Sequence, residues 1–167
     1  QLTIIGVGAF EWCINLKTIT IPSSVVEIEW QAFDNCEKLE NVIFKKESQL
    51  LTIGYLAFAH CVELHGIQIP PSVKFIDTEA FTGCTSLTSI IIPAFVEQIG
   101  CKAFSDCPNL TNIEVDANNE TYDSRNNCNA IIHTSSNTLI VGCCSTVIPS
   151  TIKCIGDSAF YACKNLL

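Results

Sequence analysis

The segment IGVGAFEWCINL, which runs from Ile5 to Leu16, is repeated five more times along this chain. Every copy fits the pattern I-x-x-x-A-F-x-x-C-x-x-L, and its phenylalanines are Phe10, Phe33, Phe58, Phe81, Phe104 and Phe160. Successive phenylalanines lie 23, 25, 23, 23 and 56 residues apart, so one longer unit separates the fifth copy from the sixth. A period of this length predicts a stack of similar structural units.

Each copy continues into a short apolar pattern of the form L-x-x-I-x-I. Apolar residues two positions apart point to the same side of a strand, so the pattern predicts one half-buried strand per unit. A proline such as Pro22 or Pro93 can follow because the ladder ends there. The inward residues are Leu16/Ile19/Ile21, Leu39/Val42/Phe44, Leu64/Ile67/Ile69, Leu87/Ile90/Ile92 and Leu110/Ile113/Val115.

One strand and one short return per unit is the signature of leucine-rich repeats, whose stacked units share a continuous core. With its recurring pattern IGxxAFxxCxxLxxIxIPxSV, the chain resembles the BspA-like leucine-rich repeats along essentially its whole length. Proteins of that family are found on the surfaces of oral and gut bacteria and of some protozoa. The expected fold is a leucine-rich-repeat solenoid, a short right-handed arc. Its parallel β-sheet lies on the concave face, and its convex returns are irregular or briefly helical.

Residues 1–167 are interpreted as a single array of about six repeats of 23–25 residues, with one long unit at 110–142. In that unit, residues 130–134 and 138–141 flank Ser135, Ser136 and Asn137, which predicts a β-hairpin near 129–141. The hairpin is expected to replace or cap a convex return. Both ends fall inside repeats, so we expect an array truncated at both ends and able to associate end to end.

The chain contains 11 cysteines, and six of them lie three residues after the repeat phenylalanine. A position that recurs with the core is expected to be buried, where a free thiol acts as a small hydrophobe. Side chains one strand spacing apart are poorly placed for disulfides, so we expect a ladder of unpaired thiols. The ladder is Cys13, Cys36, Cys61, Cys84, Cys107 and Cys163. The other five cysteines are Cys101, Cys128, Cys143, Cys144 and Cys154. One disulfide among them remains an alternative, and their spacing does not favour a zinc site.

Composition narrows the classes of function. The net charge of −8, from 17 acidic and 9 basic residues, argues against a nucleic-acid partner. No apolar run is long enough for a membrane helix, so no membrane insertion is expected. The three histidines fall on different parts of the predicted solenoid, and acidic residues such as Asp34 are expected to be solvated. Because nucleophile-elbow and phosphate-loop motifs are missing, we expect no catalytic residues, no metal, no cofactor and no enzyme activity.

The strand pattern also identifies the outward side chains of the concave sheet. They form a small, hydroxyl-rich strip that includes two exposed isoleucines, and concave solenoid faces of this kind bind other molecules. The candidate binding residues are Lys17, Thr18, Thr20, Glu40, Asn41, Ile43, His65, Gln68, Thr88, Ser89, Ile91, Thr111, Asn112 and Glu114. The alternative is that threonine and isoleucine are present because they are good strand formers.

The function expected from these features is non-enzymatic recognition or adhesion. The partner would be an extracellular or host-matrix protein or glycan, bound through the concave sheet by a module that is secreted or on the cell surface. The alternative is a structural spacer of a larger surface protein, without a ligand of its own. An intracellular scaffold is a third hypothesis.

Overall fold

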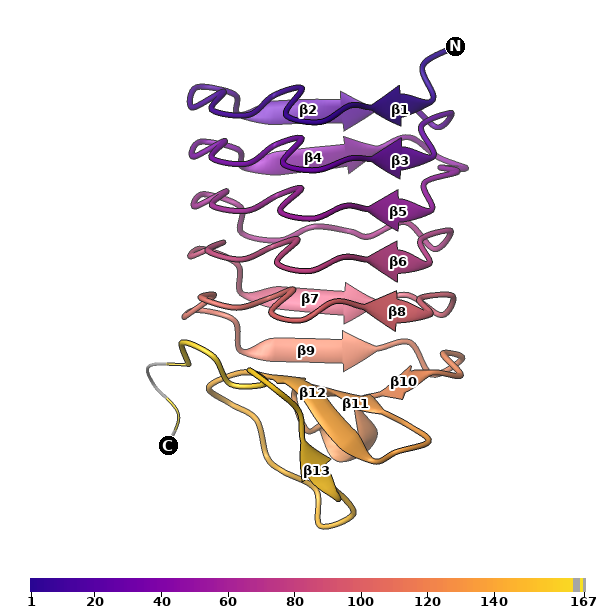
Figure 1. The fold of residues 1–167 in the computed structure, drawn as a ribbon, viewed down its shortest axis with the longest axis vertical. Coiled ribbons are helices and arrows are strands. Elements are labelled where there is room, and N and C mark those ends of the chain that lie inside the picture. The colour runs from indigo at the N-terminus through magenta and orange to yellow at the C-terminus, as the bar shows by residue number, and fades with distance from the viewer. Residues whose placement is uncertain (164–165, 167) are drawn as a thin grey trace.

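The computed structural model, which describes residues 1–163 and 166, is a parallel β-solenoid (Figure 1). Each regular turn contributes a two-residue strand to one side, and all of these turns but the third contribute a four-residue strand to the other. The long strands are β2 (Thr18–Ile21), β4 (Asn41–Phe44), β7 (Ser89–Ile92) and β9 (Asn112–Val115). The short ones are β1 (Ile4–Ile5), β3 (Glu27–Ile28), β5 (Thr52–Ile53), β6 (Phe75–Ile76) and β8 (Gln98–Ile99). The leucine-rich-repeat solenoid expected from the sequence is therefore confirmed.

The returns form a second parallel sheet, in the order β1-β3-β5-β6-β8. Outside these strands, alternate amides of a return donate to carbonyls of the next return. Phe10 N, for example, lies 2.8 Å from Ala32 O. Two positions per return have a left-handed backbone, occupied in the first by Gly8 (φ 60°) and Trp12 (φ 59°). The short helices allowed by the sequence are not formed there. In the described residues, the single helical segment is the 3-10 turn Arg125–Asn127.

The core is built from aligned ladders of identical residues. The rings of Phe10, Phe33, Phe58, Phe81 and Phe104 are stacked, with centroids 5.0 to 5.5 Å apart and planes within 5°. The repeat cysteines lie beside them, and Cys36, Cys61 and Cys84 are fully buried. All 11 cysteines are free. The prediction that the repeat aromatic and thiol positions are core positions is confirmed for the central turns.

Three members of the predicted thiol ladder are not buried. Cys13 is exposed, because no earlier turn covers it, and Cys107 is half-buried, because the long unit that follows does not repeat the standard return. The expectation that both are buried is therefore wrong. Cys163 is half-buried in the last return.

The long-strand sheet is not continuous. β2 pairs with β4, and β7 pairs with β9, but residues 65–69 form no strand, and the predicted strand of the third unit is absent. In the two ladders that form, the last bond is donated by a residue with an N–H: Lys45 N to Ile21 O at 3.0 Å and Asp116 N to Ile92 O at 2.9 Å. At the two missing ladders, Pro70 and Pro93 occupy this position. Proline has no N–H, so the closing bond cannot form there.

The predicted β-hairpin is present. β11 (Ala130–His133) pairs antiparallel with β12 (Thr138–Gly142), and β10 (Tyr122–Asp123) and β13 (Cys154–Ile155) complete a four-stranded sheet. Arg125 fixes its base by donating to Asn137 Oδ1 at 2.7 Å and to Asp123. Burial tends to raise the pKa of Asp123, but the hydrogen bonds from Arg125 outweigh it and hold that pKa below its ordinary value. β11 is buried on both sides, with Ile131 in the main core and Ile132 in a smaller second core.

Candidate binding face

The candidate binding residues lie on one side of the solenoid, on β2, β4, residues 65–69, β7, β9 and the residues next to these strands. We call this surface the long-strand face. Asn112 is half-buried and the other candidates are exposed, namely Lys17, Thr18, Thr20, Glu40, Asn41, Ile43, His65, Gln68, Thr88, Ser89, Ile91, Thr111 and Glu114. They are exposed because the intervening residues of each strand point into the core, as the alternation of a β-strand requires.

Strand register brings these side chains together in two patches. On the first, β2 and β4 place Thr20 beside Ile43, and Lys17 Nζ lies 3.9 Å from Glu40 Oε1. On the second, β7 and β9 place Ile91 beside Glu114. Residues 65–69 lie between the two patches (Figure 1).

The second patch is ordered by side-chain hydrogen bonds along the stack. Thr88 Oγ1 donates to His65 O at 3.3 Å, and Thr111 Oγ1 donates to Thr88 O at 3.5 Å. Asn112 Nδ2 donates to Glu114 Oε1 at 3.0 Å. These contacts hold hydroxyl and amide groups in fixed places on the surface, where they can bond to a ligand with little further loss of entropy.

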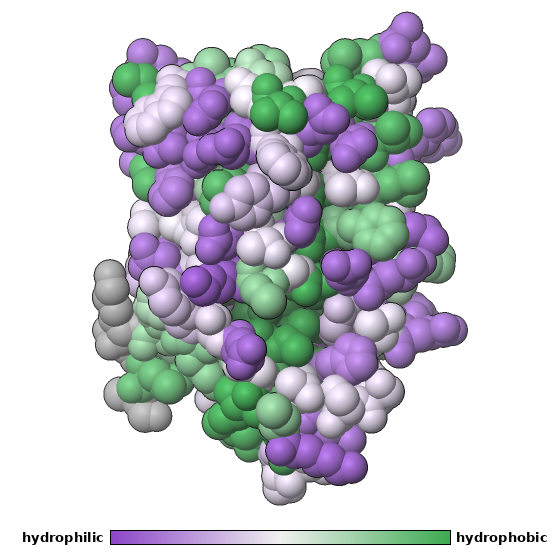
Figure 2. Space-filling model, in the orientation of Figure 1, coloured by the Kyte–Doolittle hydropathy of each residue, from purple (hydrophilic) through white to green (hydrophobic). Residues whose placement is uncertain are grey.

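Two isoleucines are the apolar contacts of the face. The side chains of Ile43 and Ile91 are 50% and 57% exposed, one on each patch. Figure 2 views the side of the molecule that carries the returns, which also has apolar residues among hydrophilic ones. Single exposed apolar residues are common on protein surfaces, and Trp30 on the return side is 59% exposed. What sets Ile91 apart is that it lies among hydroxyl and amide groups that are held in place by hydrogen bonds.

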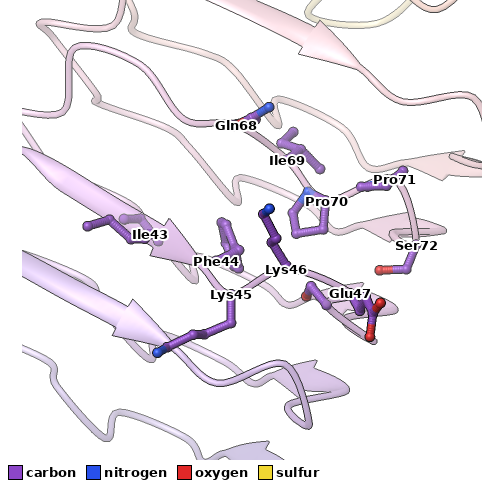
Figure 3. Close-up of a pocket in the computed structure, with 12 residues that line it drawn as sticks. Ile43, Phe44, Lys45, Lys46, Glu47, Gln68, Ile69, Pro70, Pro71 and Ser72 are labelled. Carbon is purple, nitrogen blue, oxygen red and sulfur yellow. The ribbon is translucent and has the colours of Figure 1, made fainter.

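A groove of about 540 Å³ opens beside Ile43, between the end of β4 and residues 68–72 (Figure 3). It lies where the long-strand sheet is interrupted. Its floor includes Phe44, Ile69 and Pro70, and the loop 45–48 forms one wall. Two more residues separate Phe44 from Leu50 than separate Ile21 from Val25, which explains the larger loop.

Phe44, Lys46 and Pro70 line the groove but are not among the binding residues predicted from the sequence. Two signals were present in the sequence: the step of 25 residues from Phe33 to Phe58 and the doublet Pro70-Pro71. The long step shows where a loop is enlarged, and the proline shows where a ladder bond is lost. Neither signal by itself gives the separation between two turns, which is what produces the groove.

The thiols of Cys36, Cys84 and Cys107 are not activated nucleophiles. Burial raises the pKa of Cys36 to about 11 and that of Cys107 to about 12, and it raises the pKa of Cys84 well above its ordinary value. Four ladder thiols, those of Cys36, Cys61, Cys84 and Cys107, instead donate to the carbonyl of a phenylalanine in an earlier turn, as Cys61 Sγ does to Phe33 O at 3.3 Å. A thiol held in the neutral form is a poor nucleophile and a poor metal ligand.

The histidines occupy three separate environments. His60 Nδ1 lies 2.9 Å from Asp34 Oδ1, His65 is exposed on the long-strand face, and His133 Nδ1 lies 2.9 Å from Ser136 Oγ in the hairpin turn. Asp34 is only 5% exposed, so the expectation that it is solvated is wrong. The tight stacking of the returns places His60 over it, and the pair links two successive turns.

The described residues include no group of three or more histidine, cysteine or acidic side chains placed to hold a metal ion. Over the same residues, no helix has the length and apolar character needed to cross a membrane.

The model of the BspA type leucine-rich repeat region matches six copies in this chain, over residues 3–133 and 141–167. The chain belongs to the BspA-type leucine-rich-repeat family. No curated protein matches it.

Solved structures of bacterial leucine-rich-repeat proteins have a similar fold. A leucine-rich-repeat protein of Treponema pallidum is 35% identical, with a TM-score of 0.65, and the match covers 68% of this chain and 52% of that one. A protein from Eubacterium ventriosum is 22% identical, with a TM-score of 0.77 over 96% of this chain and 42% of the other; this match shows the fold alone. A leucine-rich cell surface protein of Faecalibacterium prausnitzii is 26% identical, with a TM-score of 0.51 over 97% of this chain and 56% of that one. This BspA-type chain therefore spans about half the length of the Treponema protein.

Proposed function

We propose that this BspA-type array is a recognition or adhesion module that binds an extracellular protein or glycan through its long-strand face. The observation that carries the proposal is the exposure of Ile43 and Ile91 on a face of ordered hydroxyl and amide groups. Such a face supplies apolar contact area together with fixed hydrogen-bonding groups, the combination that protein interfaces use. Leucine-rich-repeat solenoids are typically not enzymes, and the raised pKa values of the buried thiols give no support to cysteine catalysis.

The proposed location is the cell surface or the extracellular space. The similar Faecalibacterium protein is itself a cell surface protein. Thiols that are buried and hydrogen-bonded, as in Cys36 and Cys61, are protected from oxidants outside the cell.

A binding screen tests the proposal. The purified chain is presented to immobilised extracellular-matrix proteins and to a glycan array, beside the double variant Ile43→Lys/Ile91→Lys. We expect the double variant to bind a ligand of the unmodified chain at least tenfold more weakly, because two desolvated apolar contacts are replaced by charges. Circular dichroism of the variant should be unchanged, since both side chains point to solvent.

The control is Trp30→Lys, which places a charge at a residue that is 59% exposed on the return side. The proposal expects binding by this variant to be unaffected. An equal loss from Trp30→Lys and from the double variant would place the site elsewhere. If the chain binds nothing in the screen, the spacer hypothesis is favoured instead.

A further inference from the structure

We infer that the groove between β4 and residues 68–72 binds an extended peptide segment that carries an acidic side chain between apolar ones. This inference rests on the proposed function, because the groove adjoins Ile43 on the long-strand face. It specifies a ligand class and a position that the exposed isoleucines alone do not.

Free backbone groups favour an extended peptide, one of them at Gln68 in the lining of the groove and one at Gly66 beside it. In a regular stack, the amides of Gly66 and Gln68 would donate to the carbonyls of Glu40 and Val42, as Asn41 N donates to Lys17 O at 3.1 Å in the turn before. Among the described residues, neither amide has a backbone partner. Unpaired groups at a strand edge are the groups through which a sheet accepts an additional strand.

The floor of the groove suits apolar side chains. Ile69 and Pro70 are buried, and Phe44 is half-buried beside them. The volume of about 540 Å³ is within the range of known ligand pockets. Gly66 lies outside the lining, two residues before Gln68, and the space above it is open, since a Cβ placed on this glycine would have no atom within 4 Å. Alternate side chains of an extended peptide could therefore enter from the face.

The charge on the rim favours an acidic group. Lys46 extends between Phe44 and Pro70 at the mouth of the groove, whereas Lys45 points away from it (Figure 3). Neither lysine has an acidic partner among the described residues. The chain has a net charge of −8 and Glu47 also lines the groove, but the ammonium group of Lys46 has no acidic partner in the part of the chain that the structure describes and can attract one carboxylate of a ligand. The same net charge disfavours a ligand with many acidic groups, so one such group is expected.

Three short synthetic peptides with blocked ends test this inference. Their alternating valine and threonine residues flank a central aspartate, a central lysine or a central proline. Binding is followed by the amide NMR signals of the ¹⁵N-labelled chain. We expect the aspartate peptide to shift the signals of Phe44, Lys46 and Gln68 and to bind about fivefold more tightly than the lysine peptide. The proline peptide should bind more weakly than the aspartate peptide because it lacks both the carboxylate and one backbone N–H.

Two adjacent lysines provide the matched variants. Lys46→Glu should reverse the preference, so that the lysine peptide binds more tightly than the aspartate peptide. Lys45→Glu makes the same change in charge one residue away and should retain the original preference. The inference is overturned if both variants have the same effect, or if no peptide binds up to about 1 mM. It is also overturned if a neutral oligosaccharide, tested in parallel, shifts these amide signals and the peptides do not.

These results can be separated from those of the screen. If the peptides fail while Ile43→Lys/Ile91→Lys still abolishes binding of a screened ligand, the groove assignment is wrong and the long-strand face remains the binding surface. If the peptides bind in the groove as expected while the double variant retains full affinity for the screened ligand, the face proposal is wrong and the groove stands.

Discussion

The ladder cysteines link neighbouring turns through their side chains. Cys36 Sγ donates to Phe10 O at 3.1 Å, and Cys84 Sγ donates to Phe58 O at 3.2 Å, so each thiol satisfies a main-chain carbonyl of an earlier turn. The spacing of the cysteines predicted their burial. It could not predict the acceptor, because a repeat period shows which positions stack but not which atoms meet. Cysteine therefore combines a small apolar volume with a weak hydrogen bond.

We predict that Cys36, Cys61 and Cys84 react with a thiol reagent only after unfolding. They are fully buried, and burial raises the pKa of Cys36 to about 11, so little thiolate is present near neutral pH. Titration with the reagent in buffer and then in denaturant, followed by peptide mass spectrometry, measures this. Exposed Cys101 is the internal control and should react at once. Equal rates for all cysteines, or a mass that indicates several disulfides, would contradict the ladder.

The stacked phenylalanines give a second prediction at this scale. Phe81 is fully buried, with ring centroids 5.5 Å from Phe58 and 5.3 Å from Phe104. Phe81→Ala should lower the free energy of unfolding by about 3 to 5 kcal/mol, since it leaves a cavity between two rings. Denaturant unfolding measures the change. Phe95→Ala, at a side chain that is 64% exposed, should cost less than about 1 kcal/mol. Similar losses from both would mean that the inward face is assigned wrongly.

At the scale of elements, local signals were sufficient for the hairpin and insufficient for the third long strand. The strands expected at 130–134 and 138–141 are observed as Ala130–His133 and Thr138–Gly142, because alternation and turn residues act within the hairpin itself. Residues 64–69 have the same strand pattern and still form no strand. Their ladder depends on bonds with other turns, and Pro70 and Pro93 cannot donate them.

The interrupted sheet makes a prediction about amide exchange. Asn112 N donates to Thr88 O at 3.2 Å and Asp116 N to Ile92 O at 2.9 Å, whereas the amides of Gly66 and Gln68 have no backbone partner among the described residues. We expect Gly66 and Gln68 to exchange at least about tenfold faster than Asn112 and Asp116, because exchange requires an open hydrogen bond. Hydrogen–deuterium exchange followed by NMR measures each site. Equal protection would show that the ladder is continuous in solution.

At the scale of the whole molecule, the hairpin joins two cores. β11 contributes Ile131 to the core of the regular turns and Ile132 to the core beneath the last return. Gly142 lies against Phe160, with no room for a Cβ at that position. The last return therefore docks on the hairpin in place of a regular turn. The hairpin itself was predicted from the sequence. Its close packing with the last return was not, because Gly142 and Phe160 meet only in the folded chain.

Gly142→Ala should weaken this docking and lower the free energy of unfolding by about 1 to 3 kcal/mol, the usual cost of overpacking. Gly66→Ala is a matched control, because its added Cβ would meet nothing within 4 Å. Thermal unfolding of both variants provides the measurement. If Gly142→Ala is as stable as Gly66→Ala, the contact between Gly142 and Phe160 does not hold the two cores together.

The candidate site was predictable in part. Strand alternation was enough to place Ile43 and Ile91 outward, because each strand has one buried side. The groove beside Ile43 was not predicted. It depends on the ladder bonds that the amides of Gly66 and Gln68 do not make and on the enlarged loop 45–48. The binding surface therefore combines a regular part, which repeats with the sequence, and an irregular part, which depends on how the turns separate.

The most direct test of the long-strand face as the binding surface is amide exchange of the chain bound to the tightest ligand of the matrix-protein and glycan screen. Our account predicts that binding slows exchange in β2, β4, β7 and β9 and leaves the return strands β1, β3, β5, β6 and β8 unchanged. Slower exchange confined to the return strands, with no change in the long strands, would contradict it.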